Sequence, residues 1–401
     1  MSRRSDFRTL RLAWAWLLAS LLLVTSCDRS DGPDAPPREK YLVESSAITN
    51  YSVAQLGTRL ASISPFVSGL IKNGVEVYRI SYRTKNTDGS DIIASGALIL
   101  PDTDQPVSLV SVQHGTITNP DDAPSNFRDG SEGSTVGALF GSLGYIIAYP
   151  DYIGYGATSN LPHPYEHRAS LASASLDMLR AVEEFLEDQQ AVKWNKKLYI
   201  AGYSEGGFAT LALQKLIEEQ AASEFDLRAS SCGAGAYDKS AFMNHLINNE
   251  THGIAGYNSL YLWVTLTYDR VYGLNRPASA YFKEPYASQI AANGKDVTIS
   301  QSLNTIFKDS FVKGINDGTD TAFLNAVADN DVYDWKPRTP TQLYHGTADQ
   351  LVFYFNSKNA YDAMRARGAT NVELIEIKGG DHGSSLTSYL LGTLSFFQAT
   401  P

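Results

Sequence analysis

The chain has 401 residues, of which 43% are hydrophobic and 19% are charged, and it contains 31 glycines. This composition is ordinary for a globular protein and excludes a collagen-like or largely disordered chain. The formal net charge is −10 and no run of lysine and arginine stands out, so we expect no nucleic-acid partner. The length predicts one large domain with an insertion, or two domains.

Residues 1–26 have the features of an export signal. Arginines are concentrated at the start, an apolar run of 13 residues spans 12–24, and small residues precede Cys27. The apolar run is shorter than the ~20 residues that a membrane-spanning helix needs. Small residues directly before a cysteine resemble the lipobox of bacterial lipoproteins. The resemblance implies cleavage before Cys27 and attachment of lipid to its sulfur.

A lipidated Cys27 would make this an exported protein of the cell envelope, attached to the inner or outer membrane. The alternative is an ordinary secretory signal followed by a chance cysteine. Residues 27–45 are mostly polar and proline-rich, which suits a tether between the membrane and a folded domain. Because Cys232 would then lack a partner, we expect no disulfide framework, and Cys232 should be buried and structural.

The chain that follows predicts an α/β fold. Residues 41–74 are expected to form an irregular or helical lead-in, and 75–84 and 91–100 a hairpin around a polar turn. Short apolar strands then alternate with loops and helices, at 107–113, 145–149, 198–203, 228–232, 341–344 and 372–377. This alternation predicts a mostly parallel, doubly wound sheet covered on both faces, with the chemistry beyond the carboxyl ends of its strands.

One segment, residues 238–335, breaks the alternation. It carries helix-like and aromatic runs, with Tyr257, Tyr261 and Trp263 among them. Because both ends of the insertion adjoin strands of the predicted sheet, we expect a helical cap over the site. The α/β core would then consist of residues 46–237 and 336–401.

Residues 202–206 (GYSEG) carry a G-x-S-x-G pattern between an apolar strand and an apolar helix. In this context the pattern predicts a nucleophile elbow, in which a tight turn exposes Ser204 and needs glycine on both sides. The amide of Glu205 would lie at a helix N-terminus, where negative charge is stabilised. The alternative is a glycine-rich turn with an ordinary serine.

A serine nucleophile needs a histidine base and a carboxylate that orients it. Asp349 follows the strand at 341–344, and His382 lies in a glycine-flanked loop after the strand at 372–377. This gives the chain order Ser, Asp, His that such sheets use. Asp381 is the rival acid, but as the neighbour of His382 it cannot easily reach the far side of the ring.

Together these segments resemble the α/β-hydrolase superfamily over about residues 75–398. The segments at 149–156 and 236–238 and the helical insertion are similar to its secretory-lipase branch. Glu205 departs from the glutamine expected after the serine in that branch. The resemblance also implies that the amide of Thr116 pairs with that of Glu205 as the second oxyanion donor.

The resemblance implies a serine hydrolase that cleaves carboxylic esters through an acyl-enzyme, acting on a small-molecule, lipid or carbohydrate ester. No cofactor and no metal are expected. His163 and His167 have the i, i+4 spacing of zinc-binding helices, but Pro164 lies between them and the glutamate is misplaced.

Two alternatives remain open from the sequence. One is a serine peptidase of the same fold, and the other is a surface binding protein that keeps the fold without turnover.

Overall fold

The computed structural model describes residues 40–61, 69–190 and 192–400. The described residues all belong to the unit Lys40–Pro401. The predicted signal peptide, Cys27 and most of the tether lie outside the described residues. Within the described ranges, no helix is both long and apolar enough to cross a membrane.

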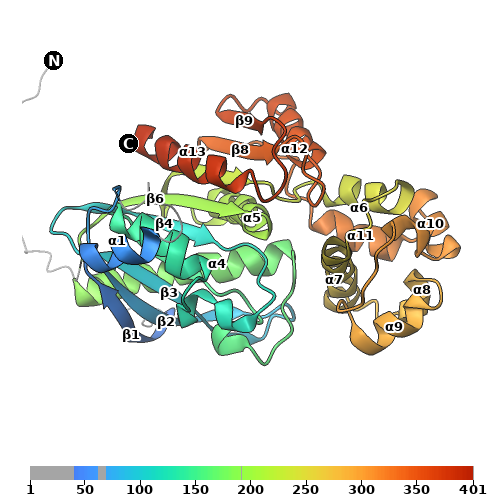
Figure 1. The fold of residues 1–401 in the computed structure, drawn as a ribbon, viewed down its shortest axis with the longest axis horizontal. Helices are drawn as coiled ribbons and strands as arrows, with labels where there is room; N and C mark the ends of the chain where they lie inside the picture. The colour runs from blue at the N-terminus through green and yellow to red at the C-terminus, as the bar shows by residue number, and fades with distance from the viewer. Residues whose placement is uncertain (1–39, 62–68, 191, 401) are drawn as a thin grey trace, which may run out of the picture. The chain divides into compact units, whose positions relative to one another are not determined.

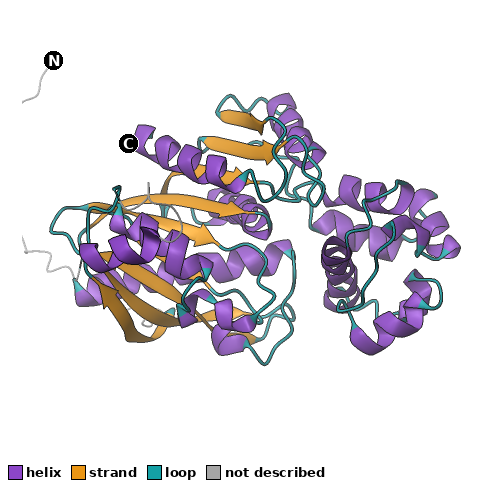
Figure 2. Cartoon of the chain, viewed as in Figure 1, coloured by secondary structure: helices purple, strands orange, loops and turns teal. Residues whose placement is uncertain are grey.

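The described part of the chain is organised around a nine-stranded sheet (Figures 1 and 2). Its strands lie in the order β1-β2-β3-β5-β4-β6-β7-β8-β9, and those from β4 onward are parallel to one another. In chain order the strands are β1 Leu42–Tyr51, β2 Val75–Lys85, β3 Asp91–Pro101, β4 Val107–Gln113, β5 Ile146–Pro150, β6 Trp194–Tyr203, β7 Asp226–Gly233, β8 Thr341–Gly346 and β9 Val372–Ile377.

Helices cover both faces of this sheet because successive strand residues point to opposite sides. Leu198 and Ile200 of β6 pack with one apolar cluster, whereas Tyr199 and Ala201 pack with another. The first face is covered by α4 (Arg168–Gln189), α5 (Glu205–Gln220) and α12 (Phe355–Ala366), and the second by α1 (Val53–Ala61), α3 (Ala138–Ser142) and α13 (Leu386–Ala399). The predicted α/β fold class is confirmed.

The lead-in differs from its prediction. The region expected to be irregular or helical contains β1 as well as α1, and β1 starts within the tether predicted over 27–45. β1 pairs antiparallel with β2 at the edge of the sheet. Most of its side chains are exposed, so its sequence lacks the apolar alternation that marks a half-buried strand. This strand is held by main-chain pairing with β2, which does not require a particular pattern of side chains.

Between β7 and β8 the chain forms helices and loops but no further strand, and we call this part the helical segment (residues 239–329). It contains α6 Lys239–Asn248, α7 Ala255–Val271, α8 Ala278–Tyr281, α9 Tyr286–Asn293, α10 Asp309–Asn316 and α11 Thr321–Asp329. These helices pack around an apolar cluster of their own, which also includes Val352 from the loop after β8. The hydroxyl of Tyr261 donates to the carbonyl of Leu351 at 2.7 Å, so α7 is fixed to that same loop.

Candidate active site

The turn between β6 and α5 holds Ser204 in a strained conformation, with φ 62° and ψ −123°. A positive φ is unfavourable for a residue with a Cβ atom and persists only where the surroundings enforce it. Here a side chain on Gly202 would collide with the main chain of Gly206, and one on Gly206 with the carbonyl of Gln113. The amide of Ser204 donates to the carbonyl of Gly233 at 2.8 Å, which fixes the turn over β7.

Ser204, His382 and Asp349 form one hydrogen-bonded chain. The Nε2 atom of His382 lies 2.9 Å from Ser204 Oγ, and its Nδ1 atom lies 2.7 Å from Asp349 Oδ2. Each residue follows the carboxyl end of a parallel strand, β6, β9 and β8 respectively, so the sheet brings together residues far apart in sequence. Tyr203 also donates its hydroxyl to the carbonyl of His382 at 2.7 Å.

Asp349 is buried but well supplied with donors. Its Oδ1 atom accepts the amides of Leu351 and Val352 at 2.9 and 3.0 Å, and its Oδ2 atom lies 3.5 Å from His345 Nε2. Burial raises the pKa of Asp349, but hydrogen bonds from His345 and His382 outweigh burial and lower the pKa to about 2. The carboxylate is therefore ionised at neutral pH and can stabilise a protonated His382.

The rival acid, Asp381, lies in a different environment. It is exposed, and its Oδ1 atom accepts the amide of Ser384 at 2.7 Å. Hydrogen bonds from Ser384 lower the pKa of Asp381. Its carboxylate therefore serves the local turn, and no described hydrogen bond joins it to the ring of His382.

The two residues expected to hold an oxyanion lie on neighbouring elements. Glu205 begins α5, and Thr116 lies in the loop after β4 with its Oγ1 atom 3.0 Å from the hydroxyl of Tyr165. Of the hydrogen bonds among the described residues, none uses the amide of Glu205 or Thr116. The amide of Gly115, the residue before Thr116, donates to Glu132 Oε2 at 3.1 Å and so fixes the loop.

The side chain of Glu205 has a partner that the sequence did not reveal. Its Oε1 atom lies 2.8 Å from His163 Nε2, and both side chains are buried. The Nδ1 atom of His163 faces the carbonyl of Ile153 at 2.6 Å. The one available signal was Glu205 itself, since a buried carboxylate beside a nucleophile needs a donor.

The pair of histidines with zinc-like spacing does not converge. His163 faces Glu205, whereas His167 lies 2.9 Å from Ser170 Oγ at the start of α4. Across the described ranges, no three His, Cys, Asp or Glu side chains are grouped so that they could hold a metal ion.

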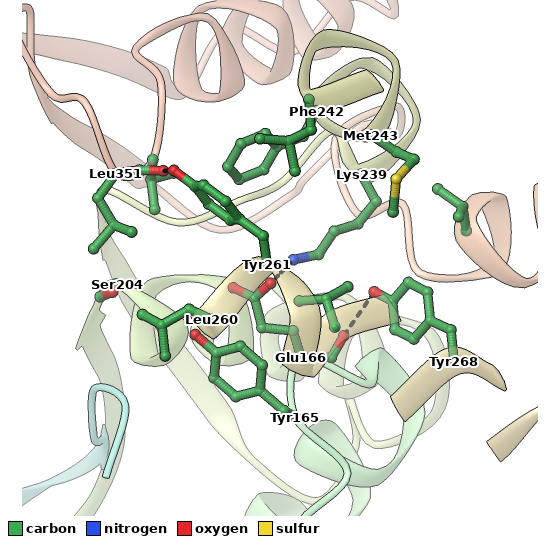
Figure 3. Close-up of a pocket in the computed structure, with 14 residues that line it drawn as sticks. Tyr165, Glu166, Ser204, Lys239, Phe242, Met243, Leu260, Tyr261, Tyr268 and Leu351 are labelled. Carbon is green, nitrogen blue, oxygen red and sulfur yellow. Dashed lines mark hydrogen bonds and ion pairs between the residues drawn. The ribbon is translucent and has the colours of Figure 1, made fainter. Parts of the chain in front are cut away.

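Ser204 opens onto two recesses. One is a cavity of about 40 Å³ toward α6 and α7, in which Lys239 and Glu166 form an ion pair (Figure 3). Its other walls are mainly apolar and include Phe242, Met243, Leu246, Leu260, Val264 and Leu351. The other recess, of about 130 Å³, lies under α13 and is lined by Val136, Phe140, Leu386 and Leu390 among others. A nucleophile between two apolar recesses suits a substrate with a substituent on each side of the reacting carbon.

Comparison with known proteins identifies relatives of this fold. The family model described as secretory lipase matches residues 132–397. A candidate hydrolase from Legionella pneumophila superposes with a TM-score of 0.80 at 25% identity, over 90% of this chain and 98% of that one. The rice cell wall degrading esterase LipA from Xanthomonas oryzae superposes with a TM-score of 0.74 at 26% identity, over 90% and 96%.

A more distant likeness shows the fold alone. Candida antarctica lipase A in its closed state has a TM-score of 0.64 at 14% identity, over 90% of this chain and 81% of that one. No curated protein sequence matches the chain.

The family match covers more than half of the chain and includes the elbow, the acid loop and the histidine loop. It favours ester hydrolysis over the peptidase and binding-protein alternatives, and it indicates an exported protein. The chain therefore belongs to the secretory lipase family and is a carboxylic ester hydrolase with the α/β-hydrolase fold.

Proposed function

We propose that the protein cleaves carboxylic esters through an acyl-enzyme, with Ser204 as nucleophile, His382 as proton carrier and Asp349 as the group that orients His382. The observation that carries the proposal is the hydrogen-bonded chain through His382, with 2.9 Å to Ser204 Oγ and 2.7 Å to Asp349 Oδ2. Both distances are within the range for proton transfer and tautomer control.

The reaction then proceeds in two halves. Ser204 Oγ attacks the ester carbonyl carbon while its proton passes to His382 Nε2. Collapse of the tetrahedral intermediate breaks the bond to the alcohol oxygen, which leaves with the proton from His382. In the second half a water gives its proton to His382 and attacks the acyl-enzyme, which releases the acid and restores Ser204.

The amides of Glu205 and Thr116 hold the negative oxygen of the intermediate. Two features support this role: neither amide is used by a described hydrogen bond, and Glu205 lies at the N-terminus of α5. Preorganised donors of this kind stabilise the charge that develops in the transition state. Glu132 supports the arrangement from behind through the amide of Gly115.

Residues 238–335 act as a cap that limits substrate size, while the core of 46–237 and 336–401 carries the reacting groups. The support is positional, because α6 and α7 line the cavity that starts at Ser204. Closed sites of this kind exclude water and select the substituents of the ester.

The sequence supports attachment of lipid at Cys27 after cleavage of residues 1–26. A single acyl chain binds membranes only marginally, so stable attachment needs the several chains of a lipoprotein. Detergent phase separation tests this. Wild-type protein should enter the detergent phase and Cys27→Ser the aqueous phase with unchanged catalysis, and recovery of wild type in the aqueous phase would contradict it.

Paired chromogenic substrates test the reaction itself. The purified protein should hydrolyse p-nitrophenyl butyrate, and a series of p-nitrophenyl esters of increasing chain length should define the acyl preference. The matching p-nitroanilide should be a far poorer substrate. Faster cleavage of the anilide would assign the site to amide hydrolysis instead.

A further inference from the structure

The cavity next to Ser204 contains a buried ion pair that the proposed reaction does not use. Lys239 is 3% exposed and Glu166 is 6% exposed, yet most of the surrounding wall is apolar (Figure 3). Burial of two charges carries a desolvation cost that their attraction often fails to repay, and apolar residues of similar volume frequently give an equally stable protein. Stability alone therefore does not account for this pair.

Both members of the pair are held in place by the helices around them. Lys239 is the first residue of α6, and its ammonium lies 4.3 Å from the centre of the Phe208 ring. Glu166 lies two residues before α4 with φ 52°, and its carbonyl accepts the hydroxyl of Tyr268 from α7 at 3.0 Å. Groups fixed in this way can bind a ligand with little loss of conformational freedom.

The pair has hydrogen-bonding capacity left over. A lysine ammonium can donate three hydrogen bonds, and the described contacts of Lys239 Nζ include one acceptor, Glu166 Oε2. The Oε1 atom of Glu166 has no described donor. Burial raises the pKa of Glu166 and lowers that of Lys239. Wherever the proton lies, the pair offers both a donor and an acceptor and has no net charge.

We propose that this pair recognises a neutral hydroxyl on the substrate, so that the preferred esters carry a hydroxyl on the short group that enters the cavity. This inference rests on the proposed function and names its substrate class. A hydroxyl can donate to Glu166 and accept from Lys239 at once. A carboxylate would lose its hydration in this mainly apolar cavity without a net positive charge to offset the loss, and a plain alkyl group would leave the polar atoms without partners.

The size of the cavity limits the group to a few atoms. A volume of about 40 Å³ corresponds to roughly three water-sized groups. Sites that hydrogen-bond a substrate hydroxyl discriminate strongly against analogues that lack it. For one hydroxyl on a charged pair, we expect a gain of about 10- to 100-fold in kcat/KM.

The test compares matched esters with and without the hydroxyl. In the acyl arm, ethyl 3-hydroxybutyrate is compared with ethyl butyrate, and in the alcohol arm, 2-hydroxyethyl butyrate with propyl butyrate. One arm should show the gain, which assigns the cavity to that half of the ester. Monoethyl succinate should be slower than ethyl butyrate. Equal rates within both arms, or a preference for the succinate, would overturn the proposal.

A double variant, Lys239→Met with Glu166→Gln, removes both charges without leaving one unpaired. Its preference for the hydroxylated ester should fall to within about twofold, whereas a preserved preference would contradict the assignment. The control is Arg276→Gln with Asp320→Asn, which removes an ion pair of the helical segment outside the cavity wall and should keep the preference. The wild-type comparison decides the question even if the double variant does not fold.

Failure of the proposed function gives a different result. In that case no ester of either arm is hydrolysed through Ser204, and Ser204→Ala turns over as fast as wild type. If only the inference is wrong, hydrolysis still depends on Ser204, but esters with and without the hydroxyl are cleaved at equal rates.

Discussion

The sheet edge, by which we mean the carboxyl ends of the parallel strands, and the helical segment contribute to the site in different ways. At the carboxyl ends of the parallel strands, Ser204, Asp349 and His382 follow β6, β8 and β9, with β7 between β6 and β8, and the loops after these strands bring the three side chains within hydrogen-bonding distance. The helical segment offers Lys239 and Tyr268, whose positions depend on how α6 and α7 pack. We therefore expect bond cleavage to depend on the sheet and substrate choice to depend on the helices.

Mutations can test this division of roles. Changes at the sheet edge should reduce the hydrolysis of all esters equally, whereas changes in the helical segment should alter the ratio between two esters.

The largest effect is expected from Ser204→Ala or His382→Ala. Each should lower kcat about 10³- to 10⁶-fold on small and large esters alike, because the members of such a unit act together. Steady-state kinetics on acetate and octanoate esters measure this, and thermal unfolding checks that the fold is intact. Near-native activity of His382→Ala would show that another group is the base.

The next largest effect is expected from Asp349→Asn, which should lower kcat about 10³- to 10⁴-fold because the amide cannot stabilise a protonated His382. Asp381→Asn is the matched control and should retain activity within about threefold, since Asp381 serves the turn at Ser384. The reverse outcome, with Asp381→Asn inactive and Asp349→Asn active, would exchange the two roles.

The low pKa of Asp349 also predicts an acid-dependent stability. The pKa is about 2 in the folded protein, below the usual ~3.9 of an unfolded chain, so the stabilisation is fully present above about pH 4 and is lost as the pH falls toward 2. The loss should be about 2 kcal/mol in the free energy of unfolding at pH 2.5, a pH that is still above the folded pKa. Urea unfolding at pH 5 and pH 2.5 measures it. Asp349→Asn should show a correspondingly flatter dependence, and an unchanged slope would contradict the assignment.

The smallest effect is expected from Trp263→Ala in α7. The Trp263 ring stacks on Tyr165 with 4.4 Å between ring centres, and Tyr165 lines the cavity and contacts Thr116. Loss of this support should change the rate ratio of long to short esters by about 3- to 10-fold and spare acetate esters. Trp194→Ala, in β6 and away from both recesses, should leave the ratio unchanged. Equal loss on short and long esters would mean that the helical segment positions the reacting groups.

The sequence predicted those parts of the molecule whose signals are local. An apolar run with a tight loop after it marks both a strand and the side chain that the strand presents, as for Ser204 and Asp349. The edge strand β1 was missed because its exposed side chains carry no alternation and its pairing with β2 is made by the main chain.

The supporting contacts of the site could not be predicted, because the partners are distant and follow no spacing rule. Lys239 lies 73 residues from Glu166, and Glu205 lies 42 residues from His163. The interpretation of residues 163–167 as a poor zinc motif gave no hint that His163 and Glu166 serve two separate buried pairs. Their partners follow from how α4, α5 and α6 meet, which depends on the whole fold.

Covalent labelling tests the central claim most directly. The protein is treated with a fluorophosphonate, digested, and mapped by peptide mass. We predict one adduct on the peptide that contains Ser204, none on that peptide in Ser204→Ala, and slow labelling in His382→Ala. An adduct on a different serine, or ester hydrolysis by a protein that the probe leaves unmodified, would contradict the assignment of Ser204 as the nucleophile.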